Sequence, residues 1–164
     1  MGEFDTPATG EATEAAAFEF LDTLSYVRID GDATDGQRAV VEMRLREGHA
    51  PPMHIHREAT ETIHVLDGEL DVHTPDSVTS LDAGASAVLP NGEPHSLHAV
   101  TQATILAATS PAGFEEFIEA VGKPAATETV PTTPPSEDAV GRVSELAPAH
   151  DIEIVGPPPV EPPE

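Results

Sequence analysis

The chain has 164 residues and carries 30 Asp and Glu against 7 Lys and Arg, which gives a formal net charge of −23 at pH 7. This length fits one domain with a hydrophobic core. The negative charge excludes nucleic acids and anionic membranes as partners, and the absence of cysteine excludes disulfides, thiolate ligands and a cysteine nucleophile. Histidine and carboxylate must therefore carry any metal chemistry.

Residues 1–17 are small and acidic without an apolar period, and we expect a mobile tail there. They lack the positive and then apolar pattern of a signal peptide, and no run of roughly 18 apolar residues follows anywhere in the chain. These features predict a soluble, cytoplasmic protein with no membrane partner.

Residues 18–110 have a different residue pattern, because short runs rich in Val, Ile, Leu and Thr recur between turn residues. Many short antiparallel strands give this pattern. The pair Asp67-Gly68 is a hairpin signal, and Pro90-Asn91-Gly92 is a second turn signal. Strands joined by short turns without helices between them predict an all-β fold in which an antiparallel sheet closes into a small β-barrel.

Residues 111–156 should form one or two C-terminal helices and a Pro/Thr linker that pack on the barrel. Apolar residues spaced three and four apart predict a first helix that begins near Phe114 and ends near Gly122. Ser136, followed by two acidic residues, is typical of the start of a second helix. Residues 157–164 read as a Pro-rich tail.

The segment GHAPPMHIHREATETIHVLDG, within the strand region, carries the first candidate site residues. Alternate side chains of a strand share a face, so His54 and His56 should project together. Glu61 follows at the start of the next expected strand and shares its inner face with Ile63 and Val65. A lone carboxylate inside an apolar barrel is costly unless a cation meets it, so Glu61 needs a partner.

A third histidine, His95, follows the second turn and stands at the head of another expected strand. Three imidazoles and one carboxylate suit one divalent transition metal, namely Fe, Mn, Ni, Co, Cu or Zn. A six-coordinate ion would keep two positions open, which is a property of catalytic sites. We therefore predict a metal site made by His54, His56, Glu61 and His95.

The chain resembles the cupin family through two motifs. It matches the first, G(X)5HXH(X)4E(X)6G, throughout, and the second, G(X)5PXG(X)2H(X)3N, except that Ala99 replaces the final Asn. This departure concerns a supporting hydrogen bond and not a ligand. The matched positions are Gly48, His54, His56, Glu61, Gly68, Gly84, Pro90, Gly92 and His95.

A finer resemblance is to single-domain cupins related to quercetin 2,3-dioxygenase, through PPMHIHREATETIHVLDGEL, FLDTL, TSPAGFEEFIEAVGKPA and APAHDIEIVGPPP. It implies a jelly-roll barrel and a metal-dependent dioxygenase that opens the ring of a flavonol or a similar enolisable aromatic compound. Glu61 would then be both a ligand and the general base, with a small-molecule substrate and dioxygen as partners. Barrels of this family often pair through their outer sheets, so a homodimer is compatible with the resemblance.

Two alternatives remain open at this point. The same metal could act as a Lewis acid in an isomerase, epimerase or lyase, because a fold alone does not select a chemistry. The barrel could also bind a metal or a small molecule without catalysis. Oxygen-independent turnover would indicate the first alternative, and tight binding without any product would indicate the second.

The other histidines are expected to have no role in the site. His64, His73 and His98 alternate out of phase with the inward positions, which predicts surface or partner-strand positions. His49 could line the mouth of the barrel, without an assigned function. Phe114 is expected to serve in packing.

Two interpretations of the charge predict different responses to salt. The acidic residues are dispersed among apolar runs, which favours a folded halophilic protein over a disordered acidic chain. At about 1 M salt the Debye length falls to about 3 Å, so self-repulsion would be screened. We expect thermal unfolding followed by circular dichroism to shift to higher temperature from dilute buffer to molar KCl. Equal stability at low salt would contradict the halophilic interpretation.

Overall fold

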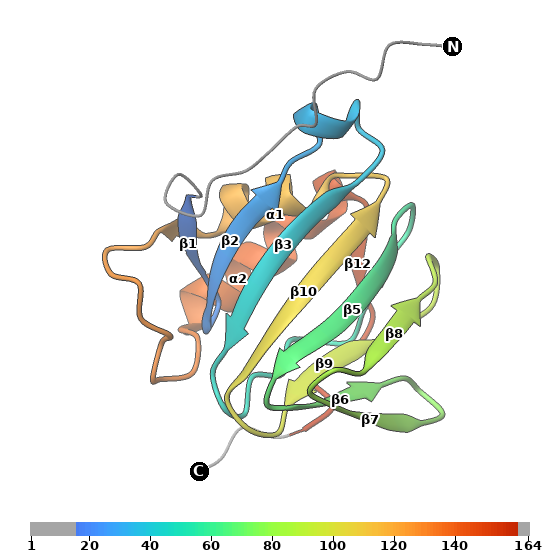
Figure 1. Cartoon of the computed structure of the whole chain (residues 1–164), viewed down its shortest axis with the longest axis vertical. Helices are drawn as coiled ribbons and strands as arrows, with labels where there is room; N and C mark the ends of the chain where they lie inside the picture. Colours follow the sequence, from blue (N-terminus) through green and yellow to red (C-terminus); the bar gives the residue numbers. More distant parts are fainter. Residues whose placement is uncertain (1–15, 161–164) are drawn as a thin grey trace.

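A computed structural model describes residues 16–160, and antiparallel strands dominate it (Figure 1). The predicted all-β fold with C-terminal helices is therefore confirmed. Most of the predicted N-terminal tail, residues 1–15, and the end of the Pro-rich tail, residues 161–164, lie outside the described residues. None of the helices in the described part has the length and apolar character needed to cross a membrane.

The larger sheet has seven strands in the order β11-β1-β2-β3-β10-β5-β8, and every neighbouring pair is antiparallel. Strands β2, β3, β10, β5 and β8 lie side by side in Figure 1. Their bounds are β1 Ala17–Phe20, β2 Thr23–Ile29, β3 Ala39–Leu45, β5 Thr60–Asp67, β8 Ser86–Leu89, β10 Ala103–Ser110 and β11 Lys123–Pro124.

The smaller sheets have the orders β7-β6-β9 and β12-β4. An isolated bridge joins them, because the amide of His54 donates to the carbonyl of His95 at 3.0 Å and the amide of His95 donates back at 2.9 Å. The two sheets thus form one layer that shares its core with the larger sheet. The bounds are β4 His54–His56, β6 Glu69–His73, β7 Val78–Asp82, β9 Ser96–Ala99 and β12 Ile152–Ile154.

The sequence of strand β3 shows that the larger sheet has one buried face and one partly exposed face. Its sequence AVVEMRL buries every second side chain, from Ala39 to Leu45, while Glu42 and Arg44 remain partly exposed. This period of two is the pleat of a strand with one face on the core. Each fully buried Val, Met or Leu side chain contributes about 1.5–3 kcal/mol to stability through the hydrophobic effect.

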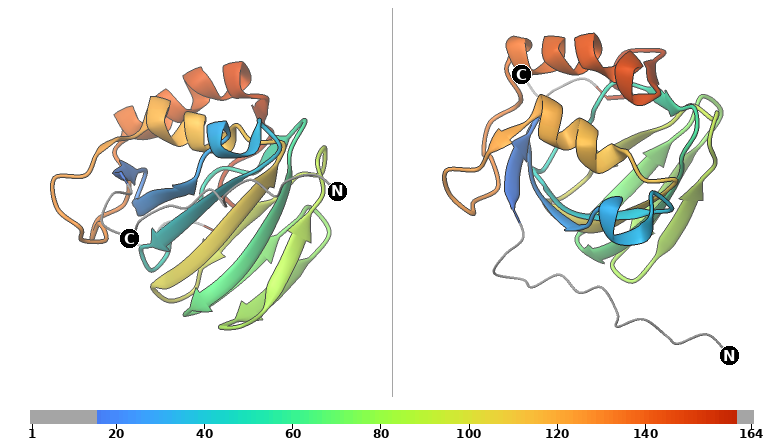
Figure 2. Two further views of the ribbon diagram at one scale, coloured as in Figure 1. Left: turned by 45° about the horizontal axis from the view of Figure 1, so that its top comes forward. Right: turned by 90° about the horizontal axis from the view of Figure 1, so that it is seen from above.

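Two α-helices lie on the same side of the larger sheet (Figure 2). The first, α1 Phe114–Val121, buries Phe117 and Ile118, as the apolar spacing predicted. The second, α2 Glu137–Leu146, begins as predicted after Ser136, whose hydroxyl accepts a hydrogen bond from the amide of Ala139 at 3.2 Å. Short 3-10 helices occupy Asp32–Thr34 and Ala147–His150.

The expected hairpin at Asp67-Gly68 is wrong, because Gly68 joins β5 to β6, which belong to different sheets and do not pair. Gly68 still has a positive φ of 84°, and a Cβ built on it would lie 2.4 Å from the carbonyl oxygen of Gln102. Gly84 has a similar φ of 92°, but a Cβ there would meet nothing within 4 Å. A side chain at Gly68 would therefore meet an unfavourable backbone conformation and a steric clash. A side chain at Gly84 would meet only the unfavourable backbone conformation.

We expect Gly84→Ala to lower the free energy of unfolding by about 1–2 kcal/mol, which is the cost of a left-handed conformation for an L-residue. Gly68→Ala should lose about 1–3 kcal/mol more, because the backbone of the neighbouring strand must move. Urea unfolding of both variants measures the difference. Equal losses would show that the close approach at Gly68 does not constrain the fold.

Candidate metal centre

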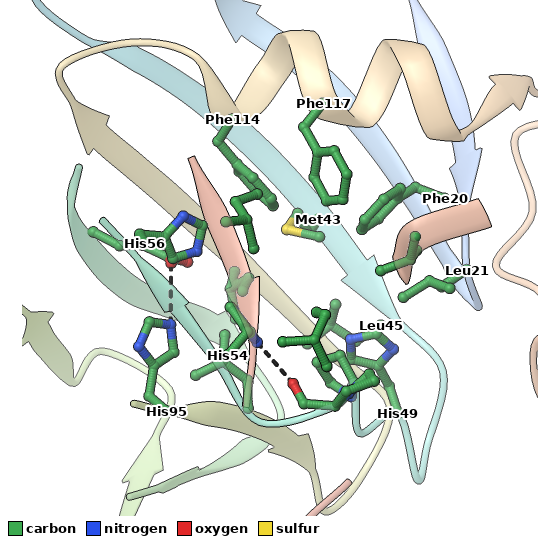
Figure 3. Close-up of a pocket in the computed structure, with 18 residues that line it drawn as sticks. Phe20, Leu21, Met43, Leu45, His49, His54, His56, His95, Phe114 and Phe117 are labelled. Atoms are coloured by element: carbon green, nitrogen blue, oxygen red, sulfur yellow. Dashed lines mark hydrogen bonds and ion pairs between the residues drawn. The ribbon is translucent and has the colours of Figure 1, made fainter. Parts of the chain in front are cut away.

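Three strands bring the predicted ligands to one place (Figure 3). Strand β4 carries His54 and His56, and His95 lies directly before β9, opposite His54 in the bridge between the two sheets. Each of the three rings offers a nitrogen, and these nitrogens lie within 4.8 Å of one another, a spacing that could hold a metal ion. The alternation of side chains along β4 thus produces the convergence that the sequence predicted.

Glu61, on β5, lies beside two of these rings. Its Oε2 is 3.1 Å from Nε2 of His56 and 3.4 Å from Nε2 of His95, and the residue is only 4% exposed. Burial alone would raise the pKa of this carboxyl, but the two neighbouring ring nitrogens outweigh burial and hold the pKa well below its ordinary value. The side chain is therefore a buried carboxylate.

Backbone carbonyls orient two of the rings. Nδ1 of His54 is 2.8 Å from the carbonyl oxygen of Pro52, and Nδ1 of His95 is 3.3 Å from that of Glu93. A carbonyl can only accept, so each Nδ1 must carry a hydrogen, and Nε2 is the atom of each ring that is left to bind an ion. Carbonyl contacts of this kind commonly fix the tautomer of metal-binding histidines.

The ring nitrogens that face Glu61 have no other partner. Nε2 of His56 and Nε2 of His95 are buried and, among the described residues, have no hydrogen bond of acceptable geometry, despite their closeness to the carboxylate. Burial first, and then the charges of His95 and His56, lower the pKa of His54 to about 3, so this ring is neutral. A neutral His54 and two further imidazole nitrogens beside a carboxylate form a donor set that fits a divalent transition metal.

An apolar cavity opens in front of this cluster (Figure 3). Three aromatic rings line it, and Phe114 packs edge-on against the ring of His56 with centroids 5.6 Å apart. The expectation that Phe114 serves only in packing is therefore wrong, because its ring is also part of the cavity wall. The apolar lining consists of Phe20, Leu21, Met43, Leu45, Pro51, Pro52, Leu97, Ile105, Phe114, Phe117, Val143, Ile152 and Ile154.

His49, which the sequence allowed at the mouth of the barrel, lines this cavity and belongs to a buried pair that the sequence did not predict. His49 is 4% exposed, and its Nδ1 forms a short contact with a carboxylate oxygen of Asp22, which itself pairs with Nε of Arg46 at 2.9 Å. Burial raises the pKa of Asp22, but the hydrogen bonds and charges of His49 and Arg46 outweigh it, so the net pKa is lowered. Asp22 and His49 are 27 residues apart, and no spacing in the sequence indicates this pair.

The three other histidines on the strands lie away from the cavity lining. His64 contacts the hydroxyl of Ser86 through Nδ1 at 2.6 Å, across β5 and β8. His73 and His98 are partly buried neighbours on β6 and β9. All three alternate with inward-facing residues, in agreement with the prediction.

Comparison with known proteins agrees with the fold. Residues 41–109 match the family described as Cupin domain. The matched stretch includes both motifs, which span residues 48–99. Quercetin 2,3-dioxygenase from Bacillus subtilis is 27% identical over 140 residues, which cover 85% of this chain and 42% of that protein. The chain thus matches less than half of the length of this curated relative.

Solved structures with a similar fold include KdgF from Halomonas sp., with a TM-score of 0.60, 14% identity, and coverage of 66% of this chain and 99% of that one. An RmlC-like cupin from Shewanella frigidimarina has a TM-score of 0.59 and 17% identity, and the match covers 68% of this chain and 96% of that one. Oxalate decarboxylase from Bacillus subtilis has a TM-score of 0.59 and 19% identity, and the match covers 70% of this chain and 32% of that one. At these identities the likeness shows the fold alone.

The Asp22 carboxylate should be essential for stability. Asp22→Asn removes the charge that pairs with Arg46 and His49 inside the protein, and breaking such a buried pair costs about 3–5 kcal/mol. Urea unfolding at neutral pH measures this loss. Arg57 pairs with Glu153 at the surface, at 2.8 Å, so Glu153→Gln is the matched control with a loss below about 1 kcal/mol.

The same pair predicts the response to acid. Because the folded pKa of Asp22 lies below the unfolded value of about 3.9, its contribution is complete above that pH and is lost as the pH falls through the folded pKa. The difference in stability between the protein and Asp22→Asn should therefore shrink below about pH 4. A difference that stays constant down to pH 2 would contradict the lowered pKa.

Proposed function

We propose that the protein is a metal-dependent cupin dioxygenase of the quercetinase type, which opens the ring of a flavonol or a similar enolisable aromatic compound. The observation that carries this proposal is the convergence of three imidazoles and a buried carboxylate at one end of an apolar cavity lined by aromatic rings. The similarity to quercetin 2,3-dioxygenase supports it.

The ligands of the ion would be His54, His56, Glu61 and His95. The unpartnered Nε2 atoms of two of these rings, beside a buried carboxylate, are the observation that fits a cation. Fe, Mn, Ni, Co, Cu and Zn all accept this donor set. When bound, such an ion would lower the pKa of a substrate hydroxyl and would provide the centre at which the bound anion meets dioxygen.

Glu61 would act as the general base. Its Oε2 faces the ring nitrogens of His56 and His95, so Oε1 is the atom left to accept the proton when the O–H bond of the substrate breaks. The electron pair of that bond would stay on the substrate oxygen. The substrate anion then carries the electron density that reaction with dioxygen requires.

The cavity walls would contact the substrate and exclude water, and the cavity of about 60 Å³ would have to widen to admit an aromatic ring. Phe20, Phe114 and Phe117 line the cavity and pack with one another at tilted or edge-on angles. A planar aromatic substrate can pack against such surfaces. A water-poor site also strengthens the electrostatic interaction between Glu61 and the substrate.

His49 would bind the polar end of the substrate. It lines the same cavity, and Figure 3 shows it on the side away from His56 and His95. Because Asp22 contacts Nδ1, the ring presents Nε2 as its remaining hydrogen-bonding group. A substrate with a hydroxyl at one end and a second polar group at the other would match both ends of the cavity.

Oxygen consumption tests this proposal. We expect the protein, loaded with one of the six metals, to consume oxygen when quercetin is added, and to leave quercetin unchanged under anaerobic conditions. Glu61→Gln should lower kcat by about 10²–10⁴-fold, because the general base is lost. His95→Ala should lower the bound metal by one equivalent and abolish turnover. His64→Gln, which replaces a histidine outside the cavity, is the matched control and should retain activity.

The alternatives have distinct outcomes. No oxygen uptake with quercetin under any metal would overturn the proposed reaction. Conversion of a substrate without oxygen would indicate an isomerase, epimerase or lyase that uses the same ligands, and tight ligand binding without product would indicate a binding protein. Metal content that is the same in the protein and in His95→Ala would overturn the ligand assignment itself.

A further inference from the structure

We propose that Asp71, His73 and His98 form a second divalent cation site, on the outer face of the sheet β7-β6-β9. Their ligand atoms lie within 4.8 Å of one another, as close as those of the three imidazoles at the cavity. The site would take a borderline transition metal such as Zn²⁺, because two imidazoles and one carboxylate are typical ligands of this ion.

Strand register produces this cluster. Asp71 lies directly opposite His98 in the antiparallel pair β6 and β9, and His73 is two residues further along β6. Alternate residues of a strand share a face, so Asp71 and His73 point the same way. A long side chain on the partner strand also reaches its diagonal neighbour, which brings His98 close to both.

The cluster lies on the opposite face from the cavity. Leu70 and Val72 alternate with Asp71 and His73 and are buried in the core, and Leu97 and Ala99 flank His98 in the same way. The inner and outer faces of one sheet therefore carry separate sets of ligands. The strands concerned lie at the lower right of Figure 1.

The polar atoms of the cluster fit an ion. Nε2 of His73 is buried and has no hydrogen-bond partner among the described residues, and the rings of His73 and His98 lie 6.0 Å apart, inclined by 61°. The hydroxyl of Ser80 donates to Oδ1 of Asp71 at 2.7 Å. Such a donor orients a metal-binding carboxylate, and Oδ2 is left for the ion.

Charge on this face favours a cation. Glu69 shares the outer face of β6 with Asp71 and lies directly opposite Asp82 on β7, so three carboxylates lie close together. Like charges directly opposite each other destabilise a pair of strands. In the described part of the chain, no Lys or Arg forms an ion pair with any of the three. A bound cation would relieve this repulsion and would link β6 to β9.

Zinc titration of the full chain tests the site. Metal-free protein titrated with ZnCl₂ by isothermal calorimetry, with elemental analysis after dialysis, should bind two equivalents. His73→Gln and His98→Gln should each lose one equivalent, whereas the matched control His64→Gln should keep both. Ser80→Ala should keep the equivalent but weaken its affinity by about 10-fold or more, because the orienting donor is lost.

The variants test the two candidate metal sites independently of each other. His95→Ala should lose the cavity equivalent and retain the one at β6 and β9, and the reverse holds for His73→Gln. If His73→Gln and His98→Gln bind as much zinc as the unchanged protein, or if a single equivalent is bound and His95→Ala abolishes it, the outer site is overturned. Zinc should also raise the Tm of His95→Ala but not that of the double variant His73→Gln/His95→Ala.

Discussion

The buried carboxylate of Glu61 is the constraint on which the rest of the site depends. An ionised group inside a protein loses several kcal/mol of hydration, and only close partners of opposite or polarisable character offset that loss. Around Glu61 these partners are the rings of His56 and His95, whose nitrogens approach its Oε2 without forming hydrogen bonds of good geometry. A cation that lies between this carboxylate and the unpartnered ring nitrogens would satisfy both. The local chemistry therefore supports an ion more strongly than any single residue does.

The fold brings these groups together through contacts between distant segments. The bridge from His54 to His95 joins the sheet that carries β4 to the sheet that carries β9, so the same two residues supply backbone hydrogen bonds and candidate ligand side chains. Strand β12 returns from the C-terminal part of the chain to pair with β4, and α1 places Phe114 against the ring of His56. Residues after the barrel thus complete the cavity wall, and removing them would expose the candidate metal centre to water.

The sequence predicted the features that depend on local periodicity, and it missed those that depend on distant contacts. A period of two indicated the shared faces of His54 with His56 and of Glu61 with the apolar residues after it, and the apolar spacing after residue 113 indicated α1. The pair of His49 with Asp22 was missed, because neither residue stands in a pattern that points to the other. Strand β12 has only three residues, which is too short to show a period. The role of Phe114 in the cavity wall depends on how α1 packs, and helical spacing does not specify this.

The two candidate metal sites use similar donors in different surroundings, and this difference governs what each could do. At the cavity the donors are buried, so water competes weakly and charges interact strongly, which suits activation of a bound substrate. At β6 and β9 the three residues are only partly buried, although Nε2 of His73 is buried, so water screens the charge of Asp71 more than that of Glu61. An ion at the outer site would therefore exchange more readily and would act on the stability of the sheet, not on a substrate. The alternation of side chains along β9 and the residues before it separates the two sets, because His95 and His98 point to opposite faces of the same layer. A single short segment can in this way supply a donor to a reaction centre and a donor to a structural link without bringing the two ions into contact.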